Sequence, residues 1–308
     1  MTPPPSRARN DPAQYDDLAA QWWDPRGTFA MLHWLARARA ALVPPASRPG
    51  AVLVDMGCGA GLLAPHVAGL GYRVAGVDLT RSALVQAAAH GEAAVQGDVT
   101  ALPLADACAD VVCAGEILEH VTDLRAAVAE ACRVLRPGGV LVVDTLAATI
   151  AARLLVITVA ERIPGAAPPG LHDPALFVDR KALVAECARH GVRLQLTGLR
   201  PSAWSVLHWL LRRDTPAVTM VRTWSTAVLF QGRGTKAPGA LASVSWRLGR
   251  AGRGSRTYTN WPCACLMSRS STDRRAIRST RSGANPSCSS GLPVRTPPIP
   301  ARASATRT

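Results

Sequence analysis

The eight cysteines of this 308-residue chain include no C-x-x-C pair and follow no regular spacing. A disulfide framework or a cysteine-bound zinc site would need such a pattern, so we expect reduced, mostly buried thiols in a cytoplasmic protein. No apolar segment follows the prolines and arginines at the N-terminus, which argues against a signal peptide. No apolar stretch reaches the roughly 20 residues that a membrane-spanning helix needs.

Acidic residues are almost absent from the end of the chain. Residues 233–308 carry 14 lysines and arginines against one aspartate, whereas residues 1–232 carry 21 against 20, so the net charge of +14 comes mostly from the tail. The tail also has no sustained apolar period, which predicts disorder. A nucleic-acid-binding protein that uses this tail is the alternative of another class, but the near-neutral remainder does not favour it.

Residues 52–62 read V-L-V-D-M-G-C-G-A-G-L, which predicts a buried strand, a glycine loop and the start of a helix. Glycines at 57, 59 and 61 let the backbone approach a small ligand beside the free N–H groups of that helix. The G-x-G-x-G spacing differs from the G-x-G-x-x-G of dinucleotide-binding proteins. A second strand over residues 74–79 ends in Asp78, placed to accept hydrogen bonds from ribose hydroxyls.

Further strands and helices alternate along the chain. We predict strands at 93–96, 110–114, 140–144, 192–199 and 227–231, and helices at 82–90, 124–135 and 181–190. After the fourth strand, Glu116, Glu119 and His120 have i, i+3 and i+4 spacing, which places them on one face if the turn is helical. Two carboxylates and an imidazole could bind a hard divalent cation. Alternatively, Glu119 caps a helix and His120 is a core or general-base histidine without metal.

Resemblances to two groups of known proteins reduce the range of functions to consider. The D-M-G-C-G-A-G of residues 55–61, followed by Asp78, resembles motif I and the acidic loop of class I S-adenosylmethionine-dependent methyltransferases. The W-W-D of residues 22–24, with G-x-F and L-H behind it, and the E-x-x-E-H of residues 116–120 resemble the ubiquinone-biosynthesis O-methyltransferases. The resemblance covers about residues 15–232. It implies an α/β fold, with a Rossmann-like, seven-stranded, mostly parallel sheet and helices on both faces.

The resemblance also implies roles for individual residues. S-adenosylmethionine would be held by a set that includes Arg39 at its methionine carboxylate and Asp98 at its adenine: Arg39, Asp55, Gly57, Gly59, Gly61, Asp78, Asp98 and Gly115. A turn or helix-capping aspartate is the alternative for Asp98. Mg²⁺ or another divalent cation would be held by Glu116, Glu119 and His120. The catalytic candidates are Glu119, His120 and His172, the last within P-P-G-L-H-D, where Leu171 replaces the threonine of the family's G-T-H-D.

The predicted organisation has three parts. Residues 1–14 are expected to be disordered; residues 15–232 form the methyltransferase domain, with a helical cap at 15–44 and a helical insertion at 146–175; residues 233–308 form the disordered tail. Residues 146–160 are apolar and predict a buried or lid helix, or an interfacial helix that meets a lipid-borne substrate at the inner face of the membrane.

The expected acceptor is a catechol-like or polyprenylated phenol or quinol of the ubiquinone-pathway type, with no specific nucleic acid as partner. The alternative acceptor is another small molecule, such as a quinol carbon or a secondary metabolite.

Overall fold

A central sheet is built from strands whose apolar residues are buried on one or both faces. The computed structural model describes residues 7–163, 167–212 and 218–239. The eight strands of this part are β1 (Val52–Met56), β2 (Arg73–Asp78), β3 (Ala93–Gln96), β4 (Ala109–Gly115), β5 (Leu135–Leu146), β6 (Val192–Pro201), β7 (Met220–Thr223) and β8 (Leu229–Lys236). Their order is β3-β2-β1-β4-β5-β8-β6-β7, with β1 to β5 parallel and β8 antiparallel to both its neighbours. The predicted fold class is therefore confirmed, with an eighth strand, β7, added at the edge.

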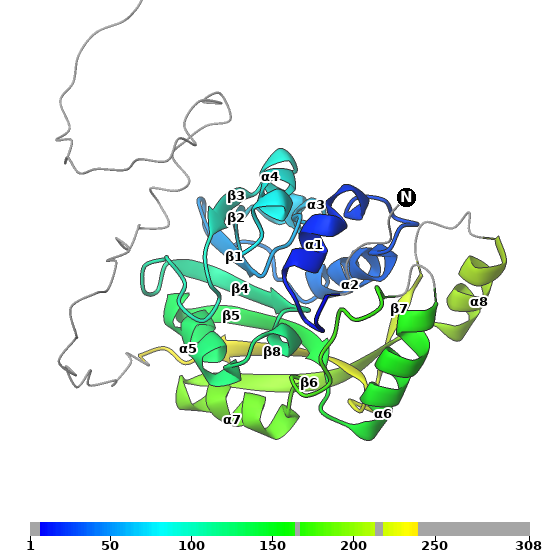
Figure 1. Cartoon of the computed structure of the whole chain (residues 1–308). Helices are drawn as coiled ribbons and strands as arrows, with labels where there is room; N and C mark the ends of the chain where they lie inside the picture. The colour runs from blue at the N-terminus through cyan, green and yellow to red at the C-terminus, as the bar shows by residue number, and fades with distance from the viewer. Residues whose placement is uncertain (1–6, 164–166, 213–217, 240–308) are drawn as a thin grey trace, which may run out of the picture. The chain divides into compact units, whose positions relative to one another are not determined.

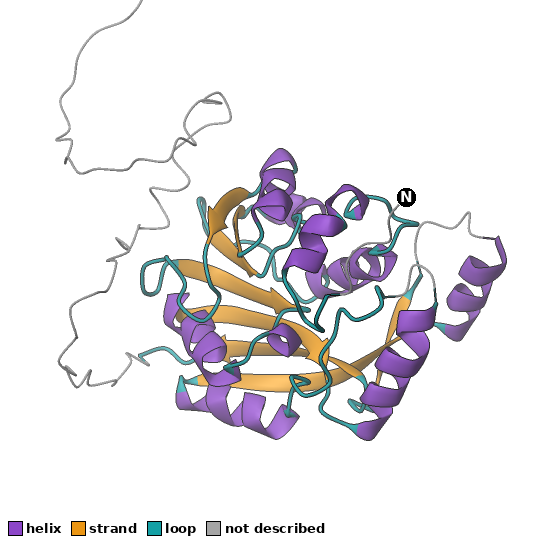
Figure 2. Ribbon diagram, viewed as in Figure 1, coloured by secondary structure: helices purple, strands orange, loops and turns teal. Residues whose placement is uncertain are grey.

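Helices cover both faces of the sheet (Figures 1 and 2). The described helices and turns are α1 (Ala13–Asp17), η1 (Ala19–Gln21), α2 (Ala30–Ala40), α3 (Ala64–Val67), η2 (Ala68–Leu70), α4 (Arg81–Ala89), η3 (Leu118–His120), α5 (Leu124–Val134), α6 (Ile150–Arg153), η4 (Leu154–Val159), η5 (Ala160–Arg162), α7 (Arg180–Arg189) and α8 (Ala203–Arg212). One core joins α5 and α7 to Val54 and Val112, and another joins α3 to their neighbours Leu53 and Val111. Because successive strand residues point to opposite faces, these cores lie on the two sides of the sheet.

The folded domain extends beyond the predicted boundaries, residues 15 and 232, at both ends. Residues 7–14, which we expected to be disordered, contact the domain through Arg9 and Asn10 and lead into α1. The strand β8 continues to Lys236, past the boundary set at residue 232. The ammonium of Lys236 donates to the carbonyls of Cys132 and Leu135, 2.8 Å from each. Residues 1–6 and 240–308 lie outside the described residues.

The insertion after β5 differs in winding from an ordinary helix. α6 begins at Ile150, where the Thr149 hydroxyl accepts from the N–H of Ala152, and it continues as the π-helical η4 and the 3-10 turn η5. No helix in the described part of the chain has the length and apolar character needed to cross a bilayer.

The position of β8 between β5 and β6 predicts where the chain can be shortened. Truncation after Gly232 removes residues 233–236, which pair with both neighbouring strands, together with the two bonds of Lys236. At about 1 kcal/mol for each hydrogen bond lost, we expect a loss of several kcal/mol in the free energy of unfolding. Truncation after Gly239 is expected to leave that free energy within about 1 kcal/mol of the full chain. Urea unfolding of the two truncated proteins measures both, and equal stabilities would contradict the prediction.

Candidate functional site

A cavity of about 390 Å³ opens where β1, β2 and β4 end. Of the residues predicted from the sequence, it is lined by Arg39, Asp55, Gly57, Gly59, Asp78, Asp98, Gly115, Glu116 and His120. Gly61, Glu119 and His172 are not part of its wall, although each lies within two residues of a residue that is. The structure therefore brings the glycine loop, the acid of β2 and the E-x-x-E-H segment to one cavity, as the strand-end rule predicts.

The glycine loop is held against the end of β2. Gly59 has a φ of 52°, and a Cβ there would lie 2.7 Å from the Trp22 ring, so both its conformation and its surroundings require glycine. The N–H of Gly59 donates to Oδ2 of Asp78 at 2.9 Å, and the N–H of Thr80 donates to Oδ1 at 2.7 Å. Burial raises the pKa of Asp78, while these backbone bonds oppose the rise. The loop and the acid thus form one preassembled unit.

Asp98 fits both of its predicted roles. Its carboxylate accepts from the N–H and the hydroxyl of Thr100, which is a turn-capping arrangement, and it also lines the cavity.

A buried ion pair lies beneath the end of β4. The Arg39 guanidinium of α2 donates from Nε and Nη2 to the two oxygens of Asp144, at 2.7 and 2.8 Å. Gly115 leaves the space for it, because a Cβ there would overlap the guanidinium. This two-point geometry leaves Nη1 of Arg39 outside the pair. Asp144 was missed in the sequence, although its position near the end of β5 gives the same strand-end signal as Asp78.

The turn over the E-x-x-E-H residues is not one regular helix, so the condition for a shared helical face is not met. Glu116 has a φ of 53° and precedes the short 3-10 turn η3, which contains Glu119 and His120. Glu119 is fully buried, and its Oε2 accepts from the Thr145 hydroxyl at 2.7 Å. His120 instead turns toward the N-terminal segment, with Nδ1 2.6 Å from Oδ1 of Asn10 and Nε2 3.5 Å from the Tyr15 hydroxyl.

The electrostatics of this segment follow from burial. Burial raises the pKa of Glu119 to about 7, and burial together with the neighbouring carboxylates raises the pKa of Glu116 well above its usual value. Burial also lowers the pKa of His120 to about 3, with His172 adding to the effect. The imidazole of His120 is thus neutral across the physiological range.

These residues do not fit a divalent cation in the arrangement described. One oxygen each of Glu116 and Glu119 is buried without a hydrogen-bond partner, which a cation could satisfy, but His120 contacts Asn10 and Tyr15 instead. Among the described residues, no three or more His, Cys, Asp or Glu side chains are grouped to hold a metal ion.

Comparisons with known proteins agree with this geometry. Residues 54–143 match a family described as "Methyltransferase domain". The chain is 35% identical over 207 residues to the ubiquinone biosynthesis O-methyltransferase of Caulobacter vibrioides, covering 60% of this chain and 81% of that protein. It is 36% identical over 213 residues to that of Burkholderia pseudomallei K96243, covering 66% and 90%. The chain belongs to this family of O-methyltransferases.

A solved structure shares the fold at low sequence identity. The S-adenosylmethionine-dependent methyltransferase of Thermotoga maritima, described as a possible histamine N-methyltransferase, superposes with a TM-score of 0.51 at 19% identity, covering 72% of this chain and 97% of that one. The predicted family, enzyme class and S-adenosylmethionine dependence are confirmed.

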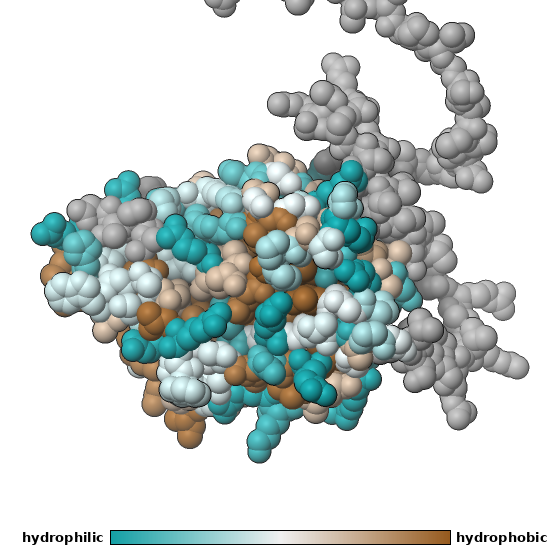
Figure 3. Space-filling view, turned by 180° about the vertical axis from the view of Figure 1, so that it is seen from behind, coloured by the Kyte–Doolittle hydropathy of each residue, from teal (hydrophilic) through white to brown (hydrophobic). Residues whose placement is uncertain are grey.

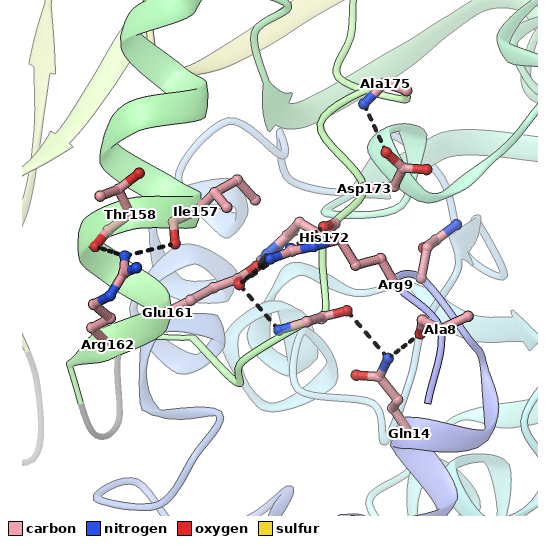
Figure 4. Close-up of polar contacts among 12 residues, drawn as sticks. Ala8, Arg9, Gln14, Ile157, Thr158, Glu161, Arg162, His172, Asp173 and Ala175 are labelled. Carbon is pink, nitrogen blue, oxygen red and sulfur yellow. Dashed lines mark hydrogen bonds and ion pairs between the residues drawn. The ribbon is translucent and has the colours of Figure 1, made fainter. Parts of the chain in front are cut away.

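In this methyltransferase, His172 lies behind His120 rather than in the cavity wall. The two rings stack with centroids 5.4 Å apart. Glu161 of η5 faces His172, with Oε1 3.6 Å from Nδ1, and its carboxylate accepts from the Arg9 guanidinium and the N–H of Gly170 (Figure 4). Burial alone would raise the pKa of Glu161, but these partners hold it at about 2. Asn10, Tyr15 and Glu161 were missed in the sequence because no motif marks them.

A second buried acid supports the glycine loop from below. Glu92 is 5% exposed, and its carboxylate fills the space beside Gly76 of β2, next to Cys58. Burial and the nearby Asp55 raise the pKa of Glu92 to about 9. The folded methyltransferase therefore keeps a proton on Glu92 at neutral pH.

The protonated Glu92 predicts a pH dependence of stability. The folded state binds one more proton than the unfolded state between the ordinary glutamate pKa and about 9, so stability should fall as pH rises through that window. Glu92→Gln removes this dependence. Between pH 5 and pH 8, the free energy of unfolding of the wild type should fall by on the order of 3 kcal/mol relative to that of the variant. Urea unfolding at both pH values measures this relative fall, and a pH-independent difference between the two proteins would contradict it.

Proposed function

We propose that the chain transfers the methyl group of S-adenosylmethionine to a hydroxyl oxygen of a catechol-like phenol or quinol that carries a polyprenyl tail. The observation that carries the proposal is the single cavity lined both by the glycine loop and Asp78 and by Glu116 and His120. The names of the relatives, ubiquinone biosynthesis O-methyltransferases, support the acceptor class.

The cofactor would lie across the ends of β1, β2 and β3. Asp78 would accept hydrogen bonds from the ribose hydroxyls, and Asp98 would accept one from the adenine amino group. Nη1 of Arg39 is available for the methionine carboxylate, because Asp144 occupies only Nε and Nη2. This placement would leave the methyl group near the end of β4.

The acceptor hydroxyl would then lie beside His120. Methyl transfer is an in-line displacement at the methyl carbon, so the enzyme must align the acceptor oxygen. The C–S bond breaks as the C–O bond forms, the sulfonium leaves as a neutral thioether, and the proton of the phenol, whose pKa is near 10, passes to solvent. His120 lines the cavity and is neutral, so its ring can accept a hydrogen bond from that hydroxyl and orient it. His172 lies outside the wall, and we assign it a supporting role behind His120.

The proposed chemistry predicts that His120 affects turnover and not cofactor binding. The purified protein is incubated with methyl-labelled S-adenosylmethionine and a panel of catechols, quinols and prenylated analogues. His120→Gln is expected to lower kcat by about 10²-fold, because a misplaced acceptor oxygen costs roughly that factor, with the cofactor Kd from calorimetry within about twofold. His190→Gln, at the end of α7, is the matched control.

Three results would change this assignment. Label on carbon instead of oxygen would favour the alternative small-molecule acceptors. Absence of cofactor binding by the folded protein would contradict the proposal as a whole. The third result concerns a divalent cation and is measured with a chelator. Loss of activity on chelation, together with loss of activity in Glu119→Gln while cofactor binding stays intact, would support a requirement for a cation.

We also propose contact with a lipid surface through the insertion. The apolar side chains of Ile150, Leu154, Leu155 and Val159 are exposed on α6 and η4, next to Arg153 and Arg162. Hydrophobic residues reach the surface at the lower left of Figure 3, on the side that carries α6. Exposed apolar residues next to arginines are typical of segments that bind anionic membranes.

Vesicle co-sedimentation tests this contact. A Leu154→Glu, Leu155→Glu double variant is expected to bind vesicles of anionic phospholipid several-fold less than the wild type, because it places two charges where acyl chains would lie. Val85→Glu changes an exposed apolar residue on α4 and is the matched control. Equal binding by all three proteins, or no binding by the wild type, would contradict the proposal.

A further inference from the structure

We propose that Asn10 is a positioning residue of the methyl-transfer site: it fixes the tautomer of His120 that carries its proton on Nδ1 and leaves Nε2 as an acceptor. The inference rests on the proposed role of His120 toward the acceptor hydroxyl. It gives a function to a segment that precedes every motif found in the sequence.

Two hydrogen bonds between the same two residues determine the tautomer. Nδ2 of Asn10 lies 2.9 Å from the backbone carbonyl of His120. A carbonyl oxygen can only accept, so the amide nitrogen must be the atom that faces it. The amide oxygen then faces Nδ1 of the ring at 2.6 Å, and because that oxygen also can only accept, Nδ1 must carry the hydrogen.

The other ring nitrogen is consequently an acceptor. A neutral imidazole has one N–H, so Nε2 presents a lone pair. The Tyr15 hydroxyl lies 3.5 Å from Nε2, at the outer limit of hydrogen-bond distance. Asn10, Tyr15 and His120 all line the cavity. Because Nε2 has one lone pair, an acceptor hydroxyl entering there would take the place of the long contact with Tyr15 and find a hydrogen-bond acceptor already oriented.

The position of Asn10 is set by contacts on both sides of it. Arg9 donates to Oε1 of Glu161 at 3.1 Å and to the carbonyl of His172 at 2.7 Å. The N–H of Asn10 donates to the carbonyl of Gly170, and the Gln14 amide donates to the same oxygen. Figure 4 shows Arg9, Gln14, Glu161 and His172 gathered between the N-terminal segment and the insertion. The segment is thus tied to the loop that carries His172.

Nitrogen-15 NMR of the histidine rings tests the tautomer directly, without substrate. The His120 signal is assigned by its absence from His120→Gln. In the wild type we expect the form protonated at Nδ1, and in Asn10→Ala we expect loss of that form or a mixture of the two. A wild-type ring protonated at Nε2 would overturn the proposal whether or not any variant folds.

Kinetics separates positioning from a merely structural role. Asn10→Ala is expected to lower kcat by about 10- to 100-fold, the typical loss when the hydrogen-bond partner that orients a functional histidine is removed. The cofactor Kd should stay within about twofold of the wild-type value. Asn10→Asp keeps an acceptor opposite Nδ1 and should retain more activity than Asn10→Ala. Arg7→Ala removes an ion pair with Asp17 in the same segment without touching His120, so it should keep kcat within about twofold.

Two kinetic outcomes would overturn the inference: an unchanged kcat in Asn10→Ala, or an equal loss in Arg7→Ala. If no catechol or quinol is methylated, the proposed function fails, but the tautomer is still decided by the NMR measurement.

Discussion

Several carboxyl groups meet where β1, β2, β4 and β5 end, and the Arg39 guanidinium lies among them. Asp55, Asp78 and Asp144 come from three different strands, and burial raises the pKa of the first two. Buried charges need partners, because water does not solvate them there. The two bonds from Arg39 to Asp144 supply one such pairing, and they do so only because Gly115 carries no side chain. This pair therefore anchors α2 against the sheet at the place where we propose that the charged cofactor binds.

Another wall of the cavity is made by segments distant in sequence. The N-terminal segment, η3 and the loop after η5 meet around His120, where hydrogen bonds and ring contacts join them. Hydrogen bonds fix orientation more strictly than apolar contacts do, because they depend on direction. The side of the cavity proposed for the cofactor is thus built on strand ends of the sheet, whereas the side proposed for the acceptor depends on contacts between loops.

The fold could be predicted from the sequence where pattern and chemistry coincide. The glycine loop, Asp78 and the helix α5 follow from local composition, and their positions agree with the structure. β7 was missed because its residues, Met220–Thr223, neither alternate in polarity nor form an apolar run, and they are only partly buried. Contacts between residues distant in sequence were also missed. No motif near Asn10 or Glu161 indicates that its hydrogen-bond partner lies more than one hundred residues away. The helical condition at Glu116 is not met for a different reason, since this residue has left-handed backbone geometry.

The late position of β8 in the chain has a consequence for how the protein is made. This strand lies inside the sheet, hydrogen-bonded to β5 on one side and β6 on the other, yet its residues follow all the other strands in sequence. During synthesis, the edges of β5 and β6 that pair with β8 stay unpaired until the ribosome has made the residues of β8. Domains generally fold as units as they emerge, so the half of this domain beyond β5 can close only after residue 236 has left the exit tunnel.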